Sequence, residues 1–286
     1  MNLIQFIGAL ELGLLYGLIA MGVYLSFRVL DFPDLTVDGS FPLGAAVLAS
    51  LILRGWSPLL ATLLATLAGA LAGLCTGYLH VRFKILGLLA GILSMTALYS
   101  INLRIMNSPN LALLDEVTLF TGIPLLLGLS CVTLILAFCL IYFLYTQTGL
   151  AMRAAGTNAR VSQAYGVNVA KMQLLGLALS NGFVALAGAL FVQSQGFADI
   201  SMGAGTIVVG LASVIIGETL CPSRKLYAAI ISVIIGSIVY RCVIAFALNS
   251  TDLGLKASDL NLITAALVAL TMIAPKLGKR MRPGKI

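Results

Sequence analysis

Long runs of uncharged apolar residues follow one another along almost the whole chain. About nine such runs lie near residues 5–27, 39–53, 57–79, 85–103, 122–145, 172–195, 203–219, 226–248 and 258–275. A helix of about 20 residues crosses a hydrocarbon core of about 30 Å. Only 9% of the residues are charged, against about 25% in soluble proteins. The sequence therefore predicts an all-α polytopic membrane protein, with two of its hydrophobic segments, 39–53 and 203–219, unusually short.

The basic residues predict the orientation of these spans. With the N-terminus outside, thirteen Lys and Arg residues fall on the cytoplasmic side and three fall outside, in accord with the positive-inside rule. The loop 146–170 and the basic tail 276–286 are then cytoplasmic, and so is the C-terminus. The net charge of +7 is scattered between apolar spans, so membrane lipid rather than nucleic acid is the expected surrounding.

Two interrupted stretches stand directly before the two short runs. The first, DFPDLTVDGSFP over Asp31–Pro42, contains two prolines, so a continuous helix is not expected there. The second, over Gly196–Gly210, is rich in glycine, and its Phe-Ala-Asp-Ile-Ser resembles Phe-Pro-Asp-Leu-Thr of the first stretch, 165 residues earlier. The first stretch enters from the cytoplasm and the second from outside, as in an inverted repeat, although five residues can also match by chance.

Paired, Gly/Pro-interrupted segments are the best sequence pointer to the substrate route of a transporter. Residues in the two stretches that carry a hydroxyl or a carboxylate are therefore the candidates for lining that route. They are Thr36, Asp38, Ser40, Ser201 and Thr206. The glycines at 69, 73 and 77 repeat at every fourth residue and predict close helix packing instead.

The loop 146–170 separates two apolar runs and carries basic residues among small and polar ones. Within it, Asn158 to Tyr165 is short and polar, and Gly156 and Gly166 bound it. Asn158 is a good helix cap, and a glycine often follows the end of a helix. We expect one short helical piece here, parallel to the membrane face, with Arg153 and Arg160 near its ends and Ala164 and Tyr165 on or beside its docking face.

The same loop resembles a known family. The order Gly149, Arg153-Ala154-Ala155-Gly156, Asn158, Ala164 and Gly166-Val167 is similar to the cytoplasmic coupling segment of permease subunits of ABC importers, in the branched-chain amino-acid permease family. The run LGLLYGLIAMGVYLSFRVLDFPDLTVDGSFPLGAAVLAS is similar to the start of the same family. The resemblance covers roughly a third of the chain. It identifies residues 1–286 as a single transmembrane permease domain.

The resemblance also implies partners. In such importers the loop helix docks in a groove of a cytosolic ABC ATPase dimer, an extracytoplasmic binding protein delivers the solute, and a second permease chain completes the pathway. A homodimer in a bacterial inner membrane is expected, with ATP and magnesium bound by the ATPase and no cofactor in this chain. The implied coupling residues are Arg153, Ala154, Gly156, Asn158, Arg160, Ala164, Tyr165 and Gly166.

Enzymatic activity is not expected of this chain itself. No G-x-x-x-x-G-K-[ST] phosphate-binding loop occurs, and no His/Ser/Asp or paired-carboxylate set supports hydrolysis. The five cysteines lack paired spacing, and His80 is the only histidine, so a metal site is not expected.

Alternatives remain for the transport class and the substrate. An ion-coupled secondary transporter would favour carboxylates in mid-membrane, whereas those of the 31–38 and 115–116 regions are placed at span ends. An aromatic or branched-chain amino acid is the expected substrate, and a sugar or a nucleoside is the alternative. Charged residues inside spans are costly: Glu218 is expected to act at a helix end, and Arg241 to pair with Glu11 or with carbonyls, or else to bind a carboxylate.

Overall fold

The computed structural model describes residues 3–113, 116–222, 225–249, 265, 266 and 269. Within them, seven helices are long and apolar enough to cross a membrane. They are Leu3–Val23 (α1) with its continuation Tyr24–Val29 (η1), Pro58–Phe83 (α3), Gly87–Met106 (α4), Leu125–Tyr145 (α5), Val169–Gln195 (α8), Thr206–Leu220 (α9) with the preceding turn Ile200–Gly203 (η2), and Leu226–Asn249 (α10). A shorter apolar helix, Val37–Ile52 (α2), lies among them.

Eight of the nine expected hydrophobic runs are confirmed as helices. The long ones have the length that is needed to cross the hydrocarbon core. Most of the ninth run, 258–275, and the basic tail 276–286 lie outside the described residues. The remaining elements are short. They are the strands Asn110–Ala112 (β1) and Phe197–Asp199 (β2), which pair antiparallel, and the helices Gln147–Thr157 (α6) and Ala159–Ala164 (α7).

The first interrupted stretch breaks the helix as expected. The end of α1 widens into the π-helical turn η1, Asp31 has a φ of 53°, and α2 begins only at Val37. Pro42 lies inside α2, where its missing N–H removes the hydrogen bond that the Asp38 carbonyl would otherwise accept.

The second interrupted stretch begins with the same local turn as the first. Asp34 Oδ1 accepts a hydrogen bond of 2.9 Å from the Thr36 amide. Asp199 Oδ1 accepts one of 2.7 Å from the Ser201 amide. The aligned residues therefore have the same role, in which a carboxylate holds the backbone two residues ahead and starts a short helical segment.

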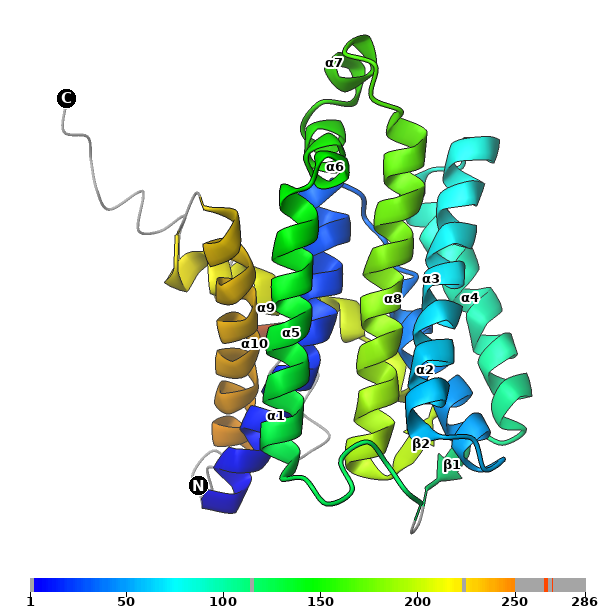
Figure 1. Cartoon of the computed structure of the whole chain (residues 1–286), viewed down its shortest axis with the longest axis vertical. Helices are drawn as coiled ribbons and strands as arrows, with labels where there is room; N and C mark the ends of the chain where they lie inside the picture. Colours follow the sequence, from blue (N-terminus) through cyan, green and yellow to red (C-terminus); the bar gives the residue numbers. More distant parts are fainter. Residues whose placement is uncertain (1–2, 114–115, 223–224, 250–264, 267–268, 270–286) are drawn as a thin grey trace, which may run out of the picture.

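The helices pair as an inverted repeat requires. A shift of about 165 residues takes α1 onto α8, α2 onto α9 and α3 onto α10, and the members of each pair run in opposite directions (Figure 1). Across the two halves, α1 packs against α10 as α8 packs against α3, and α9 packs against α1 as α2 packs against α8. The two halves are thus interlocked, with each one covering the other's first helix.

Small residues bring α3 and α8 into close contact. Gly69, Gly73 and Gly77 of α3 all face α8, as the spacing of four residues predicts. A methyl group at Gly73 would overlap the carbonyl of Leu177. The opposite faces of α3, α4 and α5 expose leucine, isoleucine and phenylalanine side chains, as expected of surfaces that meet lipid or another subunit.

Candidate functional site

The short helix expected over Asn158 to Tyr165 is present as α7, but the loop also contains a second helix, α6, so the expectation of a single helical piece for the whole loop was wrong. Thr146 caps α6, because its Oγ1 accepts a hydrogen bond of 3.3 Å from the Gly149 amide. Asn158 is extended, ends α6, and caps α7 through a hydrogen bond of 3.1 Å from the Val161 amide to its Oδ1. The predicted role of Asn158 as a cap is confirmed, and Thr146 ahead of a run of helix formers was the pattern that could have predicted α6.

The loop residues fall into two groups. Arg160, Ala164, Tyr165 and Gly166 are exposed on and after α7, and the Tyr165 side chain is 85% exposed. Gly166 has a φ of 84°, which suits glycine and ends the short helix. Figure 1 shows α7 projecting beyond the ends of the long helices, on the side of the bundle where α1 and α3 end. We call this side the α6–α7 face.

The other group belongs to α6 and faces the bundle. Gly156 lies against the carbonyl of Val29 and against Leu30, so closely that a methyl group would overlap that carbonyl. Met152 is fully buried in the same core as Val29 and Leu30, whereas Arg153 is half-buried and Ala154 is exposed. Because Val29 and Leu30 lead into the first interrupted stretch, α6 is seated on the segment that begins the candidate route.

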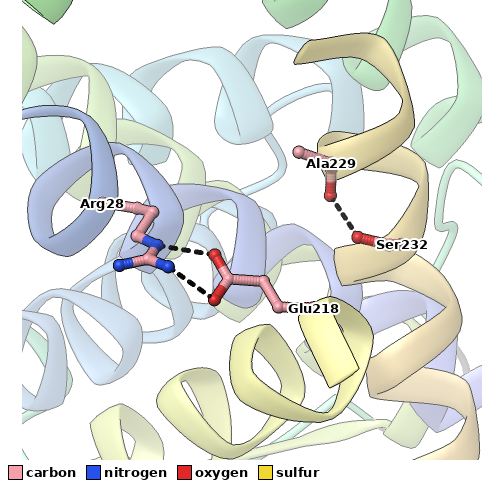
Figure 2. A network of polar contacts seen from close by, with 4 residues as sticks. All are labelled: Arg28, Glu218, Ala229 and Ser232. Atoms are coloured by element: carbon pink, nitrogen blue, oxygen red, sulfur yellow. Dashed lines mark hydrogen bonds and ion pairs between the residues drawn. The ribbon is translucent and has the colours of Figure 1, made fainter. Parts of the chain in front are cut away.

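An ion pair ties two helix ends together at the α6–α7 face. Arg28 Nε lies 2.6 Å from Glu218 Oε1, and Arg28 Nη2 lies 2.9 Å from Oε2, so the contact is bidentate (Figure 2). The pair lines a cavity of about 280 Å³ together with Arg153 and Lys225. Glu218 thus acts at a helix end as expected, through a partner that lies 190 residues away in the chain.

Of the partners expected for Arg241, Glu11 was wrong. Its guanidinium lies 3.6 Å from the centroid of the Tyr16 ring, in a cation–π contact. Among the described residues no ion pair joins Arg241 to Glu11. Arg241 instead lines a second cavity, of about 490 Å³, together with Thr206.

A buried polar network holds the first interrupted stretch against α8 and α3. Asp34 is fully buried, and its Oδ2 accepts a hydrogen bond of 2.6 Å from Asn181 Nδ2. Asn181 Oδ1 in turn accepts one of 2.7 Å from the Ser40 hydroxyl, and the hydroxyls of Thr36 and Thr76 lie 2.8 Å apart. Asn181 is near the middle of α8, and Asp34 lies beside it. The expectation that Asp34 lies at a span end, like the other carboxylates of 31–38, was therefore wrong.

A cavity of about 420 Å³ lies between α2, α4 and η2. Asp38 and Ser201 of the predicted route line it, whereas Thr36 and Ser40 are enclosed in the Asp34 network and Thr206 lies at the second cavity. The Asp38 carboxylate accepts hydrogen bonds from the amides of Gly205 (3.2 Å) and Ile207 (2.7 Å). It therefore joins the first interrupted stretch to the start of α9.

Sequence reasoning missed the contribution of α4 to this cavity. Asn102 and Tyr99 both line it. Asn102 is fully buried, and an amide inside an apolar run was the one feature that could have singled it out, since buried polar groups in a membrane are costly.

Comparison with known proteins identifies the family to which the chain belongs. A model of the family described as branched-chain amino acid transport system / permease component matches residues 5–274. The tyrosine transport system permease protein of Clostridioides difficile is 42% identical over 264 residues, which cover 92% of this chain and 88% of that protein. An uncharacterized protein of Rickettsia prowazekii is 38% identical over 74% of this chain and 76% of its own length.

A more distant relative is the ribose import permease protein RbsC of Bacillus subtilis, which is 29% identical over 71% of this chain and 65% of that protein. No solved structure matches the chain. The relatives with an assigned role are permease proteins, which are translocation components rather than enzymes. With its apolar helices and a family match that spans residues 5–274, this multi-pass membrane protein belongs to the branched-chain amino acid permease family of ABC importers.

Proposed function

We propose that this chain is the membrane-spanning permease subunit of an ATP-driven importer for an aromatic or branched-chain amino acid. An extracytoplasmic binding protein delivers the amino acid, and cytosolic ATPase subunits supply the energy with their own ATP and magnesium. The similarity to a tyrosine transport system permease over nearly the full length of both proteins supports this substrate class. The lower identity to a ribose import permease makes a sugar the second candidate.

The contact of α6 with η1 is the observation that carries the coupling proposal. The exposed surface of α7, with Ala164 and Tyr165, docks in a groove of the ATPase. Closure of the ATPase then displaces α6, and Gly156 passes that displacement to Val29 and Leu30 without a flexible side chain between them. The first interrupted stretch follows Leu30 directly, so the displacement reaches the substrate route.

Orientation and assembly complete the proposal. The α6–α7 face is cytoplasmic, because the loop and the described basic residues of the Arg28 cavity lie there. The N-terminus is then outside and the tail 276–286 inside, in a bacterial inner membrane. Two copies of the chain form the pathway, and each copy supplies one half of it, as in other permeases of this family.

The substitution Ala164→Glu tests the coupling surface. The permease is reconstituted in proteoliposomes with its ATPase and binding protein, and ATP-driven uptake of L-tyrosine, L-phenylalanine, L-leucine and D-ribose is measured. Ala164→Glu places a long charged side chain on the docking surface, so it should abolish uptake and the stimulation of ATP hydrolysis while the protein still inserts and folds. Ala164→Ser, which stays small, is the matched control and should retain both.

Two outcomes would contradict the proposal. Wild-type uptake and ATPase stimulation by Ala164→Glu would mean that this surface does not couple. Uptake of D-ribose with no uptake of any of the three amino acids would replace the substrate class.

A further inference from the structure

We propose that the cavity between α2, α4 and η2 binds the ammonium group and the apolar side chain of the amino acid as it crosses the permease. This inference rests on the proposed function and adds the site and its chemistry. It starts from the charge in the cavity: Asp38 is the only Asp, Glu, Lys, Arg or His residue among the described lining residues.

The Asp38 carboxylate is held in place but not neutralised. Two backbone amides of the Gly205–Ile207 segment donate to it, and among the described residues no basic side chain forms an ion pair with it. The side chain is half-buried in a cavity whose walls are mainly apolar. A fixed negative charge in such surroundings attracts a cation more strongly than it would in water.

The hydroxyls of Thr96 and Ser201 in the same walls present oxygen lone pairs. The Thr96 hydroxyl donates to the Leu93 carbonyl at 2.9 Å, and the Ser201 hydroxyl donates to the Asp199 carboxylate. Since each hydroxyl has only one hydrogen to donate, both can only accept further hydrogen bonds.

Asn102 lines the cavity and holds a further acceptor that neighbouring atoms enclose. Its Nδ2 donates to the Gly39 carbonyl at 3.2 Å, which fixes the orientation of the amide, and its Oδ1 has no hydrogen-bond partner. A buried acceptor without a partner is costly. Asp38, Thr96, Ser201 and Asn102 together therefore favour a ligand group that carries several donors and a positive charge, as an ammonium group does, over a carboxylate.

The rest of the wall suits an apolar body. Pro42, Met95, Tyr99 and Ile200 line the cavity, and Tyr99 is 55% exposed, at its rim. The volume of about 420 Å³ falls within the range of about 300–1,000 Å³ found for small-molecule sites. An amino acid can thus place its ammonium at Asp38 and its side chain along these residues, with its carboxylate directed to the open side.

The cavity also lies where the two repeats meet. Asp38 and Pro42 come from the first interrupted stretch, and Ile200 and Ser201 come from the second. In transporters built of inverted repeats, a site between interrupted segments changes its access as one repeat moves against the other. This position fits a site that is occupied in transit.

Binding of three related probes to the wild-type chain in lipid nanodiscs tests the chemistry directly. The probes are L-tyrosine, tyramine, which lacks the carboxylate, and 3-(4-hydroxyphenyl)propionate, which lacks the ammonium. Loss of one partner of a desolvated charge pair weakens binding by about thirtyfold or more. We expect L-tyrosine and tyramine to bind with similar affinity and the propionate to bind at least about thirtyfold more weakly; propionate binding as tight as that of tyramine would overturn the proposal.

Variants then assign the site. Asp38→Asn keeps an oxygen that can accept from Ile207 and removes the charge, and Asn102→Leu removes the unpartnered acceptor. Both should weaken tyramine binding and raise the KM for uptake more than they lower kcat. Ser94→Ala is the matched control, because Ser94 lies on the same helix and its Oγ is also buried without a partner, but it lines a different cavity.

The outcomes separate this inference from the proposed function. Unchanged tyramine binding in both variants, with normal uptake, would show that the amino acid does not bind in this cavity, while the proposal that the chain belongs to an amino-acid importer would stand. Binding of tyramine that depends on Asp38, with no ATP-driven uptake of any amino acid, would reject the importer and leave an ammonium site. If Asp38→Asn does not fold, the probe series on the wild type and the Asn102→Leu variant still decide.

Discussion

Asn181 Nδ2 in the middle of α8 donates a hydrogen bond of 2.6 Å to Asp34 Oδ2, in the break between α1 and α2. The carboxylate is fully buried, so the amide replaces part of the hydration that the charge would have in water. The same amide accepts from Ser40, and one side chain of α8 therefore fixes the position of the interrupted stretch on two sides.

Exchanging the two side chains tests this network. Asn181→Leu removes the side-chain donor to Asp34 Oδ2 and leaves only the Thr36 amide on Oδ1, so it should lower the free energy of unfolding by about 3 kcal/mol. Asp34→Asn alone sets two amide donors against each other and should also destabilise. Asp34→Asn combined with Asn181→Asp restores a donor facing an acceptor and keeps an acceptor for Ser40, although the bond of 3.0 Å from Asn181 Nδ2 to the Leu177 carbonyl is lost. Part of the stability should therefore return in a detergent unfolding titration. A double variant whose loss of stability equals the sum of the losses of Asp34→Asn alone and Asn181→Asp alone would contradict the pairing.

The Arg28–Glu218 pair predicts an unequal response to neutral substitutions. Its side chains are 61% and 30% exposed, so the pair itself contributes only about 0–1 kcal/mol. The cavity, however, contains three cations, Arg28, Arg153 and Lys225, and Glu218 is the only acid among its described lining residues. Glu218→Gln should therefore destabilise more than Arg28→Gln, because it leaves the cations to repel one another.

Salt provides the control for that comparison. Since about 1 M salt reduces the Debye length to about 3 Å, the difference in melting temperature between Glu218→Gln and Arg28→Gln should shrink at high ionic strength. Equal destabilisation by both substitutions at low salt would mean that the neighbouring cations do not act on Glu218.

Close packing of α3 on α8 predicts a contrast between two glycines. Gly73→Ala places a methyl group into the Leu177 carbonyl, whereas the nearest atom to a methyl group at Gly182 of α8 is 3.6 Å away. Overpacking of this kind costs about 1–3 kcal/mol. We expect Gly73→Ala to lower the melting temperature and Gly182→Ala to leave it nearly unchanged; the reverse order would show that the two helices are further apart than described.

The helical segments could be predicted because each depends on a local property. Hydrocarbon thickness sets the length of α3 or α5, and the matching Asp34 and Asp199 turns depend on residues only two positions apart. These features are contained in short windows of sequence, so composition and spacing were sufficient.

The candidate site could be predicted only in part, because its contacts join residues far apart in the chain. Asp38 and Ser201 were found from their interrupted stretches, but Asn102 and Tyr99 come from a helix with no such irregularity. Asp34 lies next to a break in the helix, yet the buried position of its side chain depends on Asn181, 147 residues later. No local pattern contains that partner, which is why Asp34 was placed at a span end.

The close contact of α6 with η1 predicts which substitution uncouples ATP hydrolysis from transport. Gly156→Ala adds a methyl group against the Val29 carbonyl and should push α6 away from the start of the interrupted stretch. Because α7 and its exposed surface are untouched, the ATPase should still dock, yet ATP-driven uptake should fall at least about tenfold, which corresponds to about 1.4 kcal/mol. Leu150→Met, on the exposed side of the same helix and outside the implied coupling residues, is the matched control and should transport normally. ATPase co-purification and uptake in proteoliposomes measure the two steps separately; normal uptake by Gly156→Ala would mean that the displacement reaches the substrate route by another contact.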